Sequence, residues 1–283
     1  MWRTAASENM TINTSTGKVN RRRFREKLPL GERILRRLLV PLFLGPFIHR
    51  LKPVETEHKL IRLGGDGDGG YLVPDDLVGI QRCFSPGVGP TSAFEHSLIE
   101  RGIPCHLADG TVEGPSFTHP LMTFEKVNLG AQTGEGVTTL ADWVNRHAAP
   151  DENDLLLQMD IEGAEYPVLA ATDPSLFKRF RIIVIELHQL DELTHLNGGV
   201  VNRRIPRCIA PLLDDFAVVH IHPNNHARVS HVAGYAVSRA MEFTLLRRDR
   251  ITRSRPARVF PHPLDQPNGG RGPDRILPAC WFE

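Results

Sequence analysis

A cluster of acidic residues directly follows an apolar segment in the sequence LLLQMDIEGAEYPVL (155–169). Asp160 ends the apolar run, and Glu162 and Glu165 follow within a few positions. A carboxylate at the end of a buried strand must find a partner or a ligand, because burying an unpaired charge is costly. We therefore expect Asp160 to belong to a functional site. Glu165 can instead be explained by the amino end of the next helix, which favours negative charge.

A second group of ionisable residues lies in the apolar segment RIIVIELH. Glu186 and His188 are two residues apart and so share one face of a strand, as do His220 and His222 in AVVHIH. A histidine at the carboxyl end of a strand can remove a proton from a hydroxyl group, because its ordinary pKa lies near neutral pH. We expect His188 to be the general base; the competing interpretation is a structural histidine bonded to the backbone or to Glu186.

A divalent metal ion is an alternative use of the same residues. Asp160, Glu186 and the segment HIHPNNH offer oxygen and nitrogen ligands, but no two of them have a spacing that requires a metal. We therefore assign no metal ligands. HIHPNNH is equally well explained as a loop that binds the acceptor.

Strand-like and helix-like segments alternate from about residue 56 onward and must position these residues. Such alternation is typical of a mostly parallel sheet with helices on both faces. The last two predicted strands lack a convincing helix between them, which indicates a closing hairpin. The predicted strands are 82–88, 104–109, 124–131, 154–160, 181–188, 217–222 and 241–249, and the predicted helices are 91–102, 138–147, 166–180 and 203–216.

The first strand-to-helix junction, SPGVGPTSAFE, has the features of a ligand-binding turn. Gly87 and Gly89 allow a tight turn and a close approach to a ligand, although such a turn can also serve only to let a helix leave a strand. Asp109 ends the next strand roughly 20 residues later, where a carboxylate can accept both ribose hydroxyls of a nucleoside. Ser92 replaces the third glycine of the dinucleotide motif, so S-adenosylmethionine is a better ligand than a nicotinamide dinucleotide.

Together, these motifs mean that the sequence resembles the FkbM-type methyltransferases. The resemblance implies a Rossmann-like class I methyltransferase fold, an α/β fold with a mostly parallel seven-stranded sheet and a closing antiparallel hairpin, and S-adenosylmethionine as the methyl donor. Ser85 departs from the pattern, since many methyltransferases carry an acid there. The motifs are DGGYLVP (68–74), SPGVGPTSAFE (85–95), MDIEGAE (159–165), IELH (185–188), HIHPNN (220–225) and LDQPN (264–268).

The expected activity is methylation of a hydroxyl group on a small molecule or a sugar or glycan. A nucleotide-dependent oxidoreductase and a catalytically silent relative that binds a ligand are the alternatives. The candidate cofactor-binding residues are Gly87, Gly89, Glu95, Asp109 and Asp160, and the candidate catalytic residues are His188, Asp160 and Glu186.

Composition narrows the class of protein and its partners. A chain of 283 residues with 41% hydrophobic residues can bury a full core. Its net charge of +1 gives no overall field for nucleic acid, so we expect no nucleic-acid partner. The four cysteines are widely separated and form no CxxC motif, which indicates a reducing compartment and thus a cytoplasmic protein.

We expect residues 1–55 to form a basic and apolar arm, partly flexible, ahead of a methyltransferase domain over 56–283 that ends in a Pro/Gly-rich extension. The apolar run from Leu38 to Ile48 contains two prolines and is shorter than the roughly 20 residues that span a bilayer. It also starts too far from the N-terminus for a secretory signal. A helix docked on the domain explains it, and a weak peripheral membrane contact is the alternative.

Overall fold

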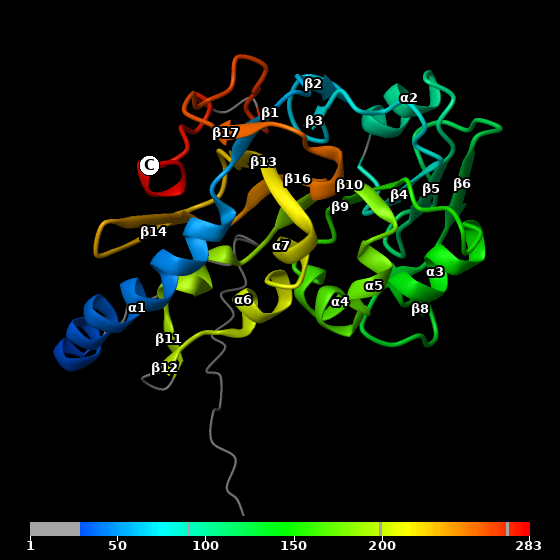
Figure 1. The fold of residues 1–283 in the computed structure, drawn as a ribbon. Helices are drawn as coiled ribbons and strands as arrows, with labels where there is room; N and C mark the ends of the chain where they lie inside the picture. The colour runs from blue at the N-terminus through cyan, green and yellow to red at the C-terminus, as the bar shows by residue number, and fades with distance from the viewer. Residues whose placement is uncertain (1–28, 90, 198–199, 270–271) are drawn as a thin grey trace, which may run out of the picture.

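A seven-stranded mixed sheet in the order β13-β16-β10-β9-β4-β5-β6 forms the centre of the molecule (Figure 1). The computed structural model describes residues 29–89, 91–197, 200–269 and 272–283. β16 runs antiparallel to both of its neighbours, whereas the other pairs are parallel. The α/β class I methyltransferase fold expected from the sequence is confirmed. The strands are β4 (Arg82–Pro86), β5 (Cys105–Ala108), β6 (Met122–Glu125), β9 (Leu155–Met159), β10 (Phe180–Leu187), β13 (Phe216–Pro223) and β16 (Met241–Arg247).

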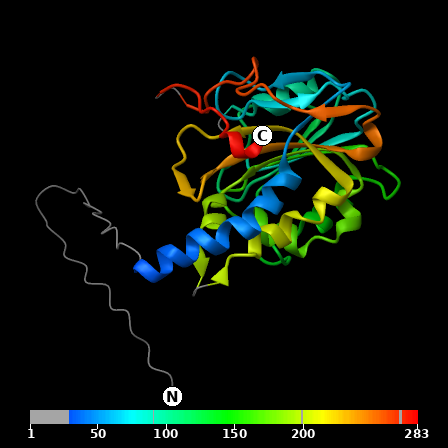
Figure 2. The same cartoon turned by 60° about the vertical axis from the view of Figure 1, so that its left-hand side comes forward.

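Both faces of the sheet are buried, which explains why its central strands are almost continuously apolar. In β9, Leu155, Leu157 and Met159 point into one hydrophobic core and Leu156 points into the other. The first core is covered by α3 to α7, and the second by α2 and the β2–β3 hairpin (Figures 1 and 2). These elements are α2 (Ala93–Ile99), α3 (Leu140–His147), α4 (Glu165–Ala171), α5 (Pro174–Phe177), α6 (Arg204–Ile209), α7 (Leu212–Asp215), β2 (Leu60–Leu63) and β3 (Tyr71–Pro74).

Three predicted elements differ clearly from the structure. The segment expected to be helical over 166–180 contains two short helices, α4 and α5, and its last residue, Phe180, begins β10. The strand expected over 124–131 was too long, because the sheet strand β6 ends at Glu125 and the chain turns there. β7 (Asn128–Leu129) pairs instead with β8 (Val137–Thr138), outside the main sheet. The helix expected over 203–216 is split into α6 and α7 at Pro211, which lacks the backbone N–H that a continuous helix would use.

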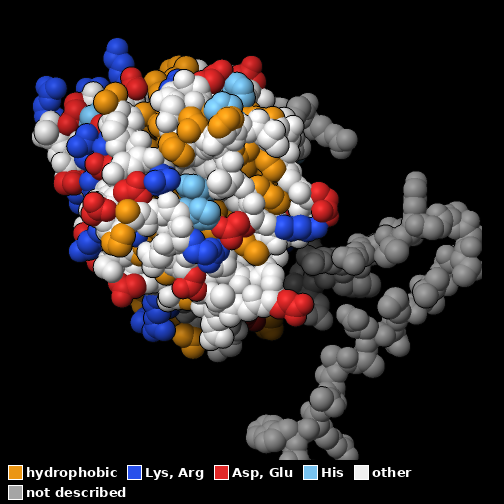
Figure 3. Space-filling model, turned by 90° about the vertical axis from the view of Figure 1, so that its right-hand side faces the viewer, with side chains coloured by type: hydrophobic (Ala, Val, Ile, Leu, Met, Phe, Trp, Pro, Cys, Tyr) orange, Lys and Arg blue, Asp and Glu red, His pale blue; other side chains and the backbone are white. Residues whose placement is uncertain are grey.

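Shorter elements tie the ends of the chain to the sheet. β1 (Val54–Thr56) pairs with β17 (Ser254–Pro256), and the β14–β15 hairpin (Val229–Val232, Tyr235–Ser238) lies between β13 and β16 in the chain. The 3-10 helix η1 (Leu190–Thr194) follows β10, and β11 (Leu196–Asn197) and β12 (Val200–Val201) follow η1. On the side that carries α2, β6 and α3, basic and acidic side chains are interspersed (Figure 3).

The first helix, α1 (Leu30–Leu51), belongs to the folded body along only part of its length. Its buried residues, Val40, Leu44, Phe47, Ile48 and Leu51, all join the core under α3 to α7. The N-terminal end of α1 projects away from the body (Figure 2). No helix in the described part of the chain is long and apolar enough to span a bilayer. The division at residue 55 stays a prediction, and residues 1–28 of the expected arm lie outside the described residues.

Two truncations test where the folded body begins. Deletion of residues 1–30 is expected to leave the thermal unfolding transition unchanged, because the buried part of α1 starts at Val40. Deletion of residues 1–51 is expected to abolish cooperative unfolding, since each buried leucine or isoleucine contributes about 1.5–3 kcal/mol. Calorimetry measures both, and a clear loss of stability in the shorter deletion would show that the leader is part of the core.

Candidate active site

The turn that follows β4 is in close contact with the end of β9. Gly87 has φ +90°, and a Cβ atom there would lie 1.7 Å from the backbone oxygen of Asp160. The backbone N–H of Asp160 donates to the Pro86 carbonyl at 3.2 Å, which holds the two strand ends together. Gly89, in contrast, has open space at its Cβ position. Gly87 is therefore required by the close approach of two strands, whereas no contact among the described residues requires Gly89.

A chain of hydrogen bonds lines the cavity beside this turn. Ser85 contacts both the Glu95 carboxyl group and Gln158 Oε1, Gln158 Nε2 donates to Tyr71 Oη at 3.3 Å, and Tyr71 Oη contacts Asp160 Oδ2 at 3.4 Å. Burial raises the pKa of Glu95. A protonated Glu95 can donate to Ser85, which can then donate to Gln158, so each proton in the chain has one acceptor. Glu95 thus brings a carboxyl group to the strand end where Ser85 replaces the acid of many methyltransferases.

Asp109 directly follows β5 and holds the glycine turn in place. Its Oδ2 accepts from the backbone N–H of Val88 at 2.9 Å, and its Oδ1 accepts from the backbone N–H and the hydroxyl of Thr111 at 2.7 and 2.6 Å. Burial opposes its ionisation, but these hydrogen bonds outweigh burial and lower the pKa of Asp109. The cavity beside Asp160 is lined by Gly87, Gly89 and Glu95 but not by Asp109. A ribose contact for Asp109 stays a prediction.

Glu165 is fully buried and organises the turn between β9 and α4. Its Oε1 accepts from the backbone N–H groups of Ile161 at 3.2 Å and Gly163 at 3.1 Å, and lies 3.0 Å from His188 Nδ1. The residue before α4 is Ala164, and no side chain caps this helix. Glu165 therefore has a structural role, as expected, but it binds the preceding turn and positions His188 instead of capping the helix.

The other ring nitrogen of His188 faces two further carboxylates. His188 Nε2 lies 3.9 Å from Asp160 Oδ1 and 3.5 Å from Glu162 Oε2. Asp160 Oδ1 is buried and has no hydrogen-bond partner. These ligand atoms lie within 4.8 Å of one another, so Asp160, Glu162 and His188 could hold a divalent cation. The bond from Glu165 to His188 Nδ1 is the support that histidine ligands commonly receive.

A row of ionisable side chains crosses four neighbouring strands at this end of the sheet. Glu186 on β10 pairs in register with Glu242 on β16, which pairs with His222 on β13. On the other side, Asp160 comes directly after Met159, which pairs with Ile185. His222 Nδ1 lies 3.2 Å from Glu242 Oε2. Glu186, Glu242 and His222 are all buried.

The surroundings of Asp160, Glu186 and His188 raise the pKa of all three groups. Burial raises the pKa of Asp160 to about 6, although the His188 cation favours its ionised form. Burial, with the charges of Asp160 and Glu242, raises the pKa of Glu186 to about 9. Burial alone would lower the pKa of His188, but Glu165, Glu186 and Asp160 raise it to about 9. These shifts favour the cationic form of His188 at neutral pH. The role of His188 as general base stays a prediction.

Two motifs near the C-terminus supply partners for this row. Asn224 Nδ2, from HIHPNN, donates to Glu186 Oε1 at 3.0 Å. Asn268 Nδ2, from LDQPN, donates to Glu242 Oε1. Glu242 and Gln158 were not singled out from the sequence. The available signal was a polar residue inside an otherwise apolar strand, because such a residue must find a buried partner.

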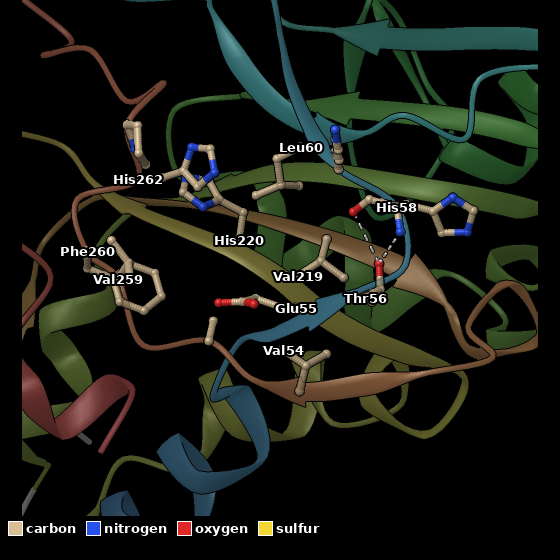
Figure 4. Close-up of a pocket in the computed structure, with 13 residues that line it drawn as sticks. Val54, Glu55, Thr56, His58, Leu60, Val219, His220, Val259, Phe260 and His262 are labelled. Carbon is tan, nitrogen blue, oxygen red and sulfur yellow. Dashed lines mark hydrogen bonds between the residues drawn. The ribbon is translucent and has the colours of Figure 1, made fainter.

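His220 lies apart from the row, in a second hollow of about 460 Å³ (Figure 4). Its Nε2 contacts Asp265 Oδ1 at 2.8 Å, and its ring lies 5.9 Å from that of His262, edge to face. The hollow is walled by β1, β13 and the segment after β17, and apolar side chains such as Val219 and Phe260 contribute much of its lining. It contains no residue of the Asp160 cavity, so we place the chemistry beside Asp160.

Comparison with protein families identifies the central part of the chain. Residues 110–200 match the family described as "Methyltransferase FkbM domain". This segment contains Asp160, Glu186 and His188, but not the glycine turn or Asp109. This segment thus matches an FkbM methyltransferase domain, and the resemblance seen in the motifs is confirmed over these residues.

Comparison with other proteins adds little. No curated protein matches the chain. A solved structure described as "Putative hemolysin from Streptococcus thermophilus" is 12% identical, with a TM-score of 0.32, over 59% of this chain and 60% of that one. A second, described as "Conversion of a Disulfide Bond into a Thioacetal Group during Echinomycin Biosynthesis", is 11% identical, with a TM-score of 0.26, over 59% and 76%. These scores are too low to support an argument about function.

The protonation of His188 can be measured without knowing the acceptor. An NMR titration of its imidazole, assigned through His188→Gln, is expected to show the cation at pH 7 and a midpoint near 9. In Glu165→Gln the midpoint is expected to fall, because the carboxylate that stabilises the cation is lost. Glu162→Gln is the control, since Glu162 is exposed and solvent strongly screens its charge. A midpoint near 6.5 in the wild type would contradict this expectation and support His188 as the general base.

Proposed function

We propose that the protein is an S-adenosylmethionine-dependent O-methyltransferase that acts on a hydroxyl group of a small molecule or a glycan. The FkbM methyltransferase domain supports methyl transfer in general. The observation that carries the choice of oxygen is Asp160, which lines the cavity beside the glycine turn and whose buried Oδ1 has no hydrogen-bond partner. A carboxylate on that wall can take the proton that a hydroxyl group loses.

In this proposal, each residue around Asp160 has a separate role in methyl transfer. S-adenosylmethionine supplies an activated methyl group, which the hydroxyl oxygen attacks as the carbon–sulfur bond breaks. Asp160 accepts the hydroxyl proton, and the His188 cation stabilises Asp160 in the ionised form that this requires. Protonated Glu186 adds no further negative charge beside Asp160. Gly89, with open space at its Cβ position, lets the donor approach the backbone.

We also propose that the protein acts in the cytoplasm. The support is that all four cysteines are free thiols, as expected in a reducing compartment. Cys83 and Cys105 are register partners on neighbouring strands and remain unbonded.

Calorimetric titration separates the proposed activity from its alternatives. S-adenosylhomocysteine is expected to bind and NAD is not, because the third glycine that serves a pyrophosphate is absent. Labelled S-adenosylmethionine incubated with cell extract and the enzyme should then mark an acceptor, with Asp160→Asn as the matched inactive control. Binding of NAD alone would favour an oxidoreductase. Donor binding without any labelled product would favour a silent relative.

Asp109 gives a sharper test of donor binding. Asp109→Ala is expected to weaken S-adenosylhomocysteine binding by about 10–100-fold, since charge-assisted hydrogen bonds contribute roughly 1.5–3 kcal/mol each. The 2′-deoxy and 3′-deoxy analogues should lose affinity with the wild type but little more with the variant, because both changes remove the same contact.

The same experiment can show that Asp109 has only a structural role in the glycine turn. If the losses from the variant and from the deoxy analogues simply add, Asp109 acts by holding Val88 and not by binding ribose. Asp151→Ala is a matched control, because Asp151 is exposed and lies outside the cavity. Unchanged affinity in Asp109→Ala would remove Asp109 from the donor site altogether.

A further inference from the structure

The N-terminal half of α1 carries a stripe of exposed apolar side chains. Leu30, Ile34, Leu38 and Leu42 recur every four residues and are 70%, 51%, 63% and 68% exposed. Residues four apart lie on the same side of a helix. The stripe is separate from the buried face of α1, which is formed by residues such as Val40 and contacts the core. This apolar surface has no partner among the described residues.

Basic side chains flank the stripe. Arg33 and Arg37 are exposed, and Glu32 is the one acidic residue among the described residues of α1. Arg33, Arg36 and Arg37 also line a hollow between α1 and the β14–β15 hairpin, together with Tyr235. In the sequence, the basic segment RRRFREK (21–27) lies shortly before α1.

We propose that the N-terminal half of α1 docks the protein on the surface of an anionic lipid bilayer. An exposed apolar stripe bordered by arginines is the composition of a helix that lies in a bilayer interface, with its leucines among the acyl chains. Arginine side chains beside the stripe reach back to the headgroups. The arginine-lined hollow beside Tyr235 offers several donors to a lipid phosphate.

The charges favour a lipid surface over a second copy of the chain. Pairing two copies through the stripe would bring their arginines together, with only Glu32 in each described helix to offset them. Against anionic headgroups the same arginines are attractive, and each contributes about 1 kcal/mol near the surface. The interspersed charges around β6 and α3 offer no comparable combination (Figure 3). The inference does not depend on the methyl acceptor or on the proposed chemistry.

Vesicle sedimentation with the full-length protein tests the inference. The protein is expected to bind vesicles of equal parts phosphatidylcholine and phosphatidylglycerol, and not vesicles of phosphatidylcholine alone. Leu38→Glu with Leu42→Glu should lower binding by at least about tenfold, since each leucine no longer enters the interface. Arg33→Gln and Arg37→Gln should each lower it by about fivefold. Val78→Glu is the matched control, because Val78 is 93% exposed and lies outside α1.

Three results would overturn the inference. The first is undiminished vesicle binding by the double leucine variant, and the second is equal binding to both kinds of vesicle. The third is a wild-type dimer in sedimentation velocity that the leucine variant turns into a monomer, with no vesicle binding by either; the stripe would then bind a second copy. Unchanged thermal unfolding of the leucine variant shows that a loss of binding does not come from misfolding.

Discussion

Three carboxylates on adjacent strand ends cannot all be ionised, and much of the site is arranged around that constraint. Asp160 directly follows β9, and Glu186 and Glu242 lie on the neighbouring strands β10 and β16, where cross-strand neighbours are only about 4.5–5.5 Å apart at Cβ. Like charges at such distances in a buried site repel by several kcal/mol. The fold compensates for the charge of two of the three carboxyl groups. Glu242 is paired with His222, Glu186 keeps its proton, and Asp160 is left to ionise.

This constraint gives the C-terminal extension a role in the site. Its Pro- and Gly-rich sequence predicts extended chain on the surface, and such a segment forms few hydrogen bonds of its own. Its polar side chains are used inward instead. Asn268 donates to Glu242, Asp265 contacts His220, and Asp274 Oδ1 lies 2.9 Å from His222 Nε2. The segment therefore completes the polar environment that β13 and β16 bring into the core.

The fold could be predicted well because the spacing of apolar residues differs between strands and helices. A pattern such as LLLQM indicates a strand buried on both faces, and a missing helix before β16 indicates the antiparallel insertion. The site was predicted less completely. That His188 and Asp160 meet follows from their strand ends, but the proton on His188 depends on Glu165, which a tight turn directs back toward the ring. In the sequence, Glu242 cannot be distinguished from any other polar strand residue. Only the strand register shows that it lies beside Glu186.

A short series of contacts links α1, on the outside of the protein, to the turn that carries His188. The C-terminal half of α1 is core, while Arg36 in its N-terminal half donates from Nε to the Thr194 carbonyl at 2.5 Å and from Nη2 to Thr194 Oγ1 at 3.1 Å. Thr194 ends η1, which begins two residues after His188, and Tyr166 Oη holds the His188 carbonyl at 2.7 Å. No long loop separates the two regions. A surface bound by α1 would therefore hold a fixed orientation toward the turn that carries His188, set by packing and hydrogen bonds and not by a flexible linker.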